Sequence, residues 1–216
     1  MDNRAHIPRP DHVGEIFAPS GHIDRLAAND VTIVEGGGPP KSARFILRER
    51  TRGEHEATEC SFAEYDIARP DHYRQFLIAH ATALPRLELG VTGLGWKDWC
   101  PRFPMLADDL AALGAPLPAP IIAPQVTPVS AWGMQYVMEG SRLGGRVLAA
   151  RLPAGAPARY LSPAPDMAIR WQGFCAALDR AAAQGGEAWL EEVVDSAIET
   201  FRVFRLGADA MLGDLR

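Results

Sequence analysis

The stretch LRERTRGEHEATE, residues 47–59, decides the fold because its polar side chains follow a helical period. On an α-helix, with about 100° per residue, side chains three or four positions apart share one stripe. The stripe around His55 is too polar for an ordinary core face. We therefore expect it to face an anion or a partner that takes an imidazole. Its members are Arg44, Arg48, Thr51, Arg52, His55 and Glu59.

The composition is that of a globular protein with one substantial core. The chain has 216 residues, of which 47% are apolar and 23% charged, and a second independent domain would be cramped. No apolar run approaches the ~18–20 residues that cross a bilayer. The opening residues, MDNRAHIPRPDHVGEIF, lack an apolar signal core. We expect a cytoplasmic protein with no membrane span.

Net charge and cysteine usage argue against two further classes of protein, those that bind nucleic acid through a general positive charge and those held together by disulfides. A net charge of -5 gives no general attraction to nucleic acid, although a local basic face could still bind an anion. The three cysteines, Cys60, Cys100 and Cys175, are widely spaced and form no CxxC pair. This pattern fits a reduced compartment, and we expect small buried apolar residues at these positions.

The chain divides into an irregular N-terminal extension, residues 1–40, and a helical domain, residues 41–216. The extension carries scattered Pro and Gly, with VTIV at 31–34 as a possible short strand. Apolar periodicity predicts helices and no strand in the domain, hence an all-α bundle. The expected helices begin at the N-cap Ser42 and span 70–87 with a kink or break at Pro85, 101–114, 129–152, 166–182 and 187–212.

Glycines conflict with the helix expected over residues 129–152. Each interior Gly costs about 1 kcal/mol against Ala, so Gly140, Gly144 and Gly145 need a compensating reason. Close approach of a neighbouring helix and close approach of a flat ligand are both sufficient. Taken alone, the run slightly favours a tight helix crossing without a ligand.

A haem would explain both the polar stripe around His55 and the glycines at 140, 144 and 145. Its iron accepts a histidine, its faces are flat, and its propionates suit guanidinium groups such as Arg48 and Arg52, one to two turns before His55. His80 is the rival ligand, but its apolar neighbours favour a half-buried packing role. The other histidines are predicted to be solvated: His6, His12, His22 and His72. Hydrolase, Walker and Rossmann motifs are absent, as is the histidine spacing of a metal cage.

Together these segments resemble the haem oxygenase family, and most of all its bacterial, biliverdin-producing branch associated with phytochromes. Residues 47–59 resemble the proximal-helix signature, in which Leu47, Thr51, His55 and Glu59 keep the family spacing. Residues 131–152 resemble the distal helix, whose glycines lie over the haem. Three shorter segments follow the family order, so that the resemblance covers residues 42–212: ADDLAALG (107–114), RWQGFCAALD (170–179) and IETFRVF (198–204).

The resemblance implies a haem oxygenase-like multi-helical bundle and a monooxygenase that degrades haem to biliverdin, carbon monoxide and ferrous iron. Haem would be both substrate and cofactor, with iron bound through His55. Catalytic positions would lie on the distal helix at Gly140, Ser141 and Gly144. The implied haem-binding positions are Arg48, Thr51, Arg52, Gly145, Arg146 and Arg170.

Ser141 departs from the animal enzymes, which carry an aspartate at that position. A hydroxyl relays protons through water but does not supply a carboxylate's charge. A haem-binding carrier or sensor without turnover is therefore the alternative, and a related helical bundle without haem is a third reading. Because the sequence carries no flavin or nicotinamide motif, electrons would come from an external ferredoxin or reductase. A bacteriophytochrome would be the partner that receives biliverdin.

Overall fold

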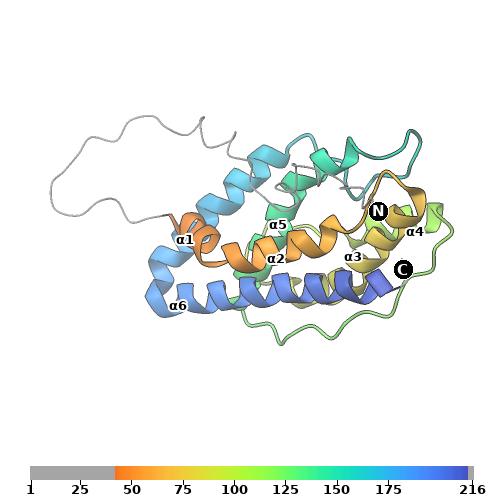
Figure 1. Cartoon of the computed structure of the whole chain (residues 1–216). Coiled ribbons are helices and arrows are strands. Elements are labelled where there is room, and N and C mark those ends of the chain that lie inside the picture. The colour runs from red at the N-terminus through yellow and green to blue at the C-terminus, as the bar shows by residue number, and fades with distance from the viewer. Residues whose placement is uncertain (1–41, 214–216) are drawn as a thin grey trace, which may run out of the picture.

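The computed structural model describes residues 42–213, and within that range the chain forms six helices and no strand (Figure 1). The all-α bundle expected from the apolar periodicity is thereby confirmed. The expected N-terminal extension, its short strand and its histidines lie outside the described residues. The helices are α1 (Ala43–Arg50), α2 (Arg52–Ala63), α3 (Pro70–Val91), α4 (Phe103–Ala112), α5 (Ser130–Ala149) and α6 (Met167–Leu212).

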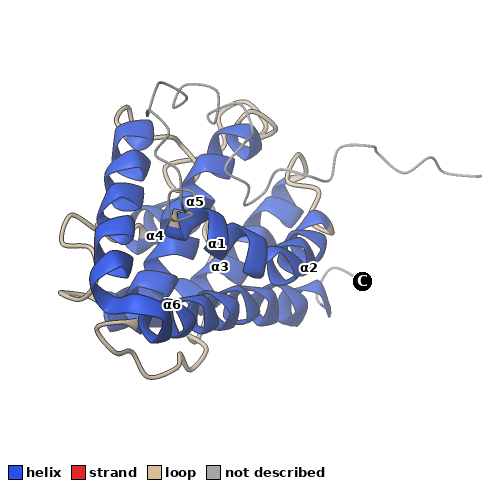
Figure 2. Cartoon of the chain, turned by 90° about the vertical axis from the view of Figure 1, so that its left-hand side faces the viewer, coloured by secondary structure: helices blue, strands red, loops and turns tan. Residues whose placement is uncertain are grey.

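Helix α6 is the packing partner that the other long helices share. It contacts α1, α2, α3 and α5 (Figures 1 and 2). Its buried side chains include Phe174, Val194 and Phe201. Gly186 interrupts it with φ 73° and ψ −164°, a conformation that glycine adopts without strain. The two halves correspond to the two helices expected over 166–182 and 187–212, and Figure 1 shows them running in different directions.

Two helix ends differ from expectation. The first expected helix is divided at Thr51, where φ is −95° and ψ is 0°, and the Thr51 hydroxyl donates to the Leu47 carbonyl at 2.8 Å. Pro85, in contrast, does not break α3, which runs on to Val91. Proline lacks an N–H donor. Nearby, the Thr82 carbonyl accepts a hydrogen bond from the Ile121 amide of the following loop at 2.7 Å.

Carboxylates from distant parts of the chain cap two helices. Asp179 of α6 accepts the Ala43 amide at 2.8 Å, together with the Ser42 hydroxyl. Glu88 of α3 accepts the amides of Arg102 and Phe103, at 2.6 and 3.0 Å, at the start of α4. Each carboxylate satisfies amides that have no partner inside their own helix. These bonds fix α1 on α6 and α4 on α3.

The cysteine expectation is wrong for two of three positions. Cys175 is buried, whereas Cys60 and Cys100 are exposed, and all three are free thiols. Their spacing in the sequence does not reveal which face of an element they occupy. Among the described residues, no helix combines the length and the apolarity that a membrane crossing requires.

Candidate functional site

His55 lies on α2 with its imidazole held between two helices. Its Nδ1 is 3.6 Å from the carboxylate of Glu59, one turn later, and its side chain is 19% exposed. The ring meets Phe201 of α6 edge to face, with centroids 5.5 Å apart. One turn along α2, the Thr58 hydroxyl donates to the Phe201 carbonyl at 3.2 Å. The orientation of this imidazole is therefore set by α2 and α6 together.

Helix α5 packs along the same helix α6, but α2 and α5 have no extended contact with each other within the described residues.

The glycines of α5 serve different purposes. A Cβ at Gly133 would lie 2.1 Å from the Val193 carbonyl oxygen, and one at Gly145 would lie 2.8 Å from that of Leu161. A Cβ at Gly140 would meet only Trp171, at an ordinary 3.8 Å. Neighbouring backbone thus requires glycine at 133 and 145 but not at 140.

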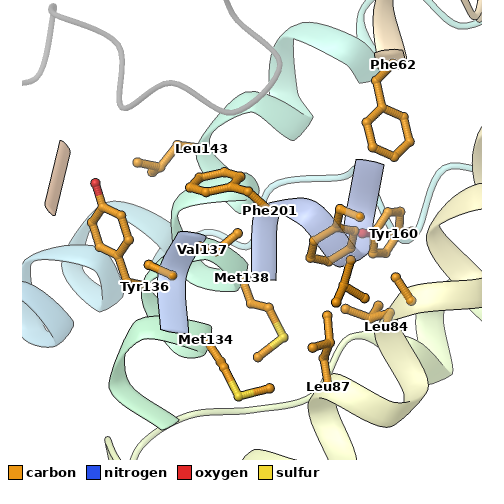
Figure 3. Packing of buried hydrophobic residues seen from close by; sticks show 14 of the residues in the cluster. Phe62, Leu84, Leu87, Met134, Tyr136, Val137, Met138, Leu143, Tyr160 and Phe201 are labelled. Atoms are coloured by element: carbon orange, nitrogen blue, oxygen red, sulfur yellow. The ribbon is translucent and has the colours of Figure 1, made fainter. Parts of the chain in front are cut away.

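The α5 face carries large buried side chains beside Gly140. Figure 3 draws Tyr136 and Leu143 along α5 together with Phe201 of α6. Burial raises the pKa of the Tyr136 phenol, and the positive charges of Arg48 and Arg44 act in the opposite direction. Two arginines of α1 thus lie near the middle of α5.

Cys175 of α6 faces the same arginine-bearing part of α1. Burial raises the pKa of its thiol to about 11, and a hydrogen bond from Arg44 opposes that rise. This contact, with Tyr136, shows that α1, α5 and α6 meet at one place. Arg48, one of the two arginines expected at the edge of a ligand, therefore lies near the glycine-bearing helix.

The other predicted site residues are spread over several environments. Thr51 is buried and bonded to the Leu47 carbonyl, whereas Arg52 and Arg146 are exposed. Arg170 donates to the Asp98 carbonyl, stacks over Trp96 and lies 3.9 Å from the Glu139 carboxylate. The structure therefore gives Arg170 protein partners of its own, away from α2. The buried Gly144 lies one turn after Gly140 on α5.

Ser141 has two polar partners, and one of them was missed by sequence reasoning. Its hydroxyl donates to the Met138 carbonyl at 2.8 Å and accepts from the Arg102 guanidinium at 2.6 Å. Arg102 is only 5% exposed and stacks over the ring of Tyr160. It is the residue directly before α4, and its contact with Ser141 joins segments 39 positions apart, which no local pattern in the sequence encodes.

His80, the rival ligand, is more deeply buried than the half-buried packing role predicted. Its Nδ1 lies 2.9 Å from the Phe76 carbonyl, and aromatic rings surround it. Burial lowers the pKa of this histidine to about 3. Within residues 42–213, no group of three or more His, Cys, Asp and Glu side chains is placed to hold a metal ion.

The fold and this arrangement define an all-α protein of the haem oxygenase class. The crystal structure of the NO- and CO-bound heme oxygenase from Neisseria meningitidis matches with a TM-score of 0.68 and 21% identity, over 80% of this chain and 93% of that one. A heme oxygenase from Xanthomonas campestris pv. campestris (strain 8004) is 34% identical over 122 residues, 51% of this chain and 73% of the relative. No family model matches. The chain belongs to the haem oxygenase family.

Proposed function

We propose that the chain degrades haem to biliverdin, carbon monoxide and ferrous iron, with His55 as the proximal iron ligand. Similarity to the Xanthomonas heme oxygenase supports the reaction. The observation that carries the ligand assignment is the position of His55. This side chain is half-buried, and Glu59 and Phe201 orient its ring. Its helix, α2, packs on α6, as does α5. Imidazole is a common proximal ligand of haem iron.

The residues present fit a haem, which supplies the iron centre for oxygen chemistry and is also the substrate. His55 would bind the iron, and the nearby Glu59 carboxylate would orient the ring. Gly140 leaves one face of the α5 backbone without a side chain, and a Cβ there would meet the Trp171 ring but no neighbouring main chain. A flat ring can therefore lie against α5, and this backbone directs which meso carbon reacts.

Basic residues on α1, α2 and α5 would hold the propionates. Arg48 is the strongest candidate because it is exposed yet close enough to Tyr136 for its charge to act there. Arg52, also exposed, lies one turn further along the chain, and Arg146 is exposed near the end of α5. Guanidinium groups bind carboxylates through paired hydrogen bonds. Arg170 is a weaker candidate, since it already has the contacts described above.

Ser141 is the proposed proton relay on the distal side. Its hydroxyl donates its proton to the Met138 carbonyl, and its Oγ accepts a hydrogen bond from the Arg102 guanidinium. Exchange of that proton with water would deliver protons without a carboxylate. Electrons would come from an external ferredoxin or reductase, and a bacteriophytochrome is the proposed acceptor of the biliverdin.

The test uses the full chain mixed with hemin and then incubated aerobically with ascorbate. We expect a histidine-ligated Soret spectrum that gives way to a green, biliverdin-like spectrum. His55→Ala should abolish the ligated spectrum and weaken hemin binding by more than about tenfold. The matched control is His72→Ala, since His72 accepts only the Asp66 amide at an exposed position. An unchanged spectrum in His55→Ala would remove this residue from iron ligation.

A haem carrier or sensor is the second candidate, and Ser141 is the observation that favours it. The hydroxyl lacks a carboxylate's charge, and both of its contacts are to protein groups. The same ascorbate experiment separates the two functions. A Soret band that persists through the incubation indicates binding without turnover.

A further inference from the structure

A cavity lies beside α5, on the side of Arg102 and Arg170 and away from His55. It has a volume of about 310 Å³ and is lined by the start of α4, by Glu139 and Arg142 of α5, by the loop 159–164 and by the first turn of α6. None of its lining residues comes from α1 or α2, the helices that carry His55, Arg48 and Arg52, and Arg170 is the one proposed propionate candidate among them.

Four arginines line this cavity: Arg102, Arg142, Arg159 and Arg170. Glu139 is the one acidic side chain among the lining residues, and it is almost fully buried. It lies 3.1 Å from Arg142 and 3.9 Å from Arg170, so two guanidinium groups share one carboxylate. Arg159 at the rim pairs with the exposed Asp108.

The remaining contacts of the guanidinium groups are to uncharged acceptors. Arg102 donates to the Ser141 hydroxyl and to the Met138 carbonyl. Arg142 also donates to the Cys100 carbonyl, and Arg170 to that of Asp98. These bonds fix the side chains without cancelling their charge. The buried Glu88 lies nearby, but both of its oxygens accept backbone amides at the start of α4.

The titration of Arg142 agrees with an excess of positive charge at this place. Burial lowers its pKa to about 10, and the neighbouring charges of Arg102 and Arg170 lower it further. Glu139 and Glu88 act in the opposite direction but do not restore the ordinary pKa of about 12.5. A bound anion would remove this repulsion.

The rest of the cavity wall is mostly apolar, although Tyr160 and Ser162 also line it. Met105, Leu161, Pro163, Ala164 and Met167 line it between the arginines. A concave apolar wall with a few convergent polar groups is typical of small-molecule sites, and the volume lies at the small end of their range of about 300–1,000 Å³. Inorganic ions would leave this wall uncovered.

We propose that this arginine-lined cavity binds a small organic anion, with a carboxylate against Arg142 and Arg102 and an apolar body against Leu161 and Met167. The ligand class is therefore an aryl or alkyl carboxylate. Because Arg102 also bonds to Ser141, such a ligand would contact the group that positions the distal hydroxyl.

The first test is calorimetric titration of the purified full chain with 1-naphthaleneacetate, before and after saturation with hemin. We expect one-to-one binding that persists with hemin, and at least about tenfold weaker binding of the neutral 1-naphthaleneacetamide. Inorganic phosphate should bind more weakly than the carboxylate. Binding that hemin abolishes, or equal affinity for the amide, would overturn the proposal. No binding below about 10 mM would do the same.

Three variants place the ligand within the cavity. Arg142→Gln should weaken binding about tenfold. Ala164→Trp should block it by filling space from an exposed position, without touching the buried charges. Glu139→Gln should strengthen binding about fivefold, because it removes the carboxylate that competes for Arg142, and a damaged fold would not produce a gain. Arg86→Gln, at an exposed position on α3, is the matched control. Unchanged affinity in all three variants would exclude this cavity.

Discussion

The histidines His55 and His80 lie in opposite environments. His55 keeps part of its imidazole accessible beside Glu59, whereas His80 is enclosed by the rings of Phe62 and Phe76. Burial disfavours the charged imidazolium, and the nearby charge of Arg102 acts the same way, which together bring the pKa of His80 down to about 3. His80 is therefore neutral whenever the protein is folded near neutral pH, and it cannot leave its carbonyl partner to bind a metal without disrupting the core.

The depressed pKa of His80 predicts a loss of stability in mild acid. Between the unfolded pKa of about 6.5 and the folded pKa of about 3, the unfolded chain binds a proton that the folded chain does not, so stability falls as pH falls. From pH 7 to pH 5 the free energy of unfolding should drop about 2 kcal/mol more in the native sequence than in His80→Leu. Urea unfolding at both pH values measures this, and carboxylates common to both proteins cancel. Equal pH slopes would contradict it.

A second prediction at the scale of single residues concerns Arg48 and Arg52. The double variant Arg48→Ala with Arg52→Ala should weaken hemin binding about tenfold, or about 1.4 kcal/mol, because two propionate partners are lost. Hemin binding by this variant should also depend less on salt concentration than hemin binding by the native sequence. Arg86→Ala removes an exposed positive charge from α3 and serves as the control. Fluorescence quenching by hemin gives the affinities. Unchanged affinity and an unchanged ratio of biliverdin isomers would exclude a propionate role.

At the scale of elements, substitution of the α5 glycines distinguishes a role in helix packing from a role in ligand binding. Gly140→Ala should leave the free protein as stable as before, since the added Cβ meets only Trp171 at 3.8 Å, yet it should weaken hemin binding by more than about tenfold. Gly133→Ala should instead destabilise the free protein by about 1–3 kcal/mol, because its Cβ overlaps the Val193 carbonyl. Thermal unfolding and hemin titration measure both properties.

Gly53→Ala completes this series as a control on α2. A Cβ at that position has no neighbour within 4 Å, so the substitution should stabilise the protein by about 0.4–1 kcal/mol through reduced freedom of the unfolded chain. If Gly140→Ala destabilised the free protein as Gly133→Ala does, its role would be packing and the bare α5 surface would have no ligand.

The helices themselves followed from local patterns, while their contacts did not. Apolar periodicity predicted each helical segment, and the gap expected between 182 and 187 corresponds to the interruption at Gly186. Pro85 was expected to kink or break α3 because proline lacks a donor, but the helix continues through it to Val91. The division at Thr51 has no marker such as glycine or proline in the sequence.

The candidate site was predictable where it follows a helical stripe and not where it depends on distant segments. His55 and Glu59 lie one turn apart, as expected, and α1 brings Arg48 close to Tyr136. Arg102 reaches Ser141 across 39 positions of the sequence, and no local pattern encodes such a contact. Arg170 was grouped with the propionate partners by resemblance alone, and the structure gives it a second environment beside Glu139.

At the scale of the whole molecule, haem would connect elements that otherwise meet only through α6. A ligand that bridges α2 and α5 binds the folded state alone, so free hemin at a hundred times its dissociation constant should stabilise the fold by about 2.7 kcal/mol. For a chain of this size that corresponds to a rise of about 5–10 °C in Tm. Scanning calorimetry measures the rise, and His55→Ala should show a much smaller one. An equal rise in both proteins would place hemin elsewhere.

The position of α6 in the order of elements bears on how the protein forms in the cell. As the chain leaves the ribosome, α1, α2, α3 and α5 appear before the helix on which they all pack. The faces that they turn toward α6 stay uncovered until synthesis has passed residue 204, where Phe204 joins the core. Nascent chains in that condition aggregate readily. The protein should therefore depend on chaperones during translation more than a bundle of sequentially paired helices does.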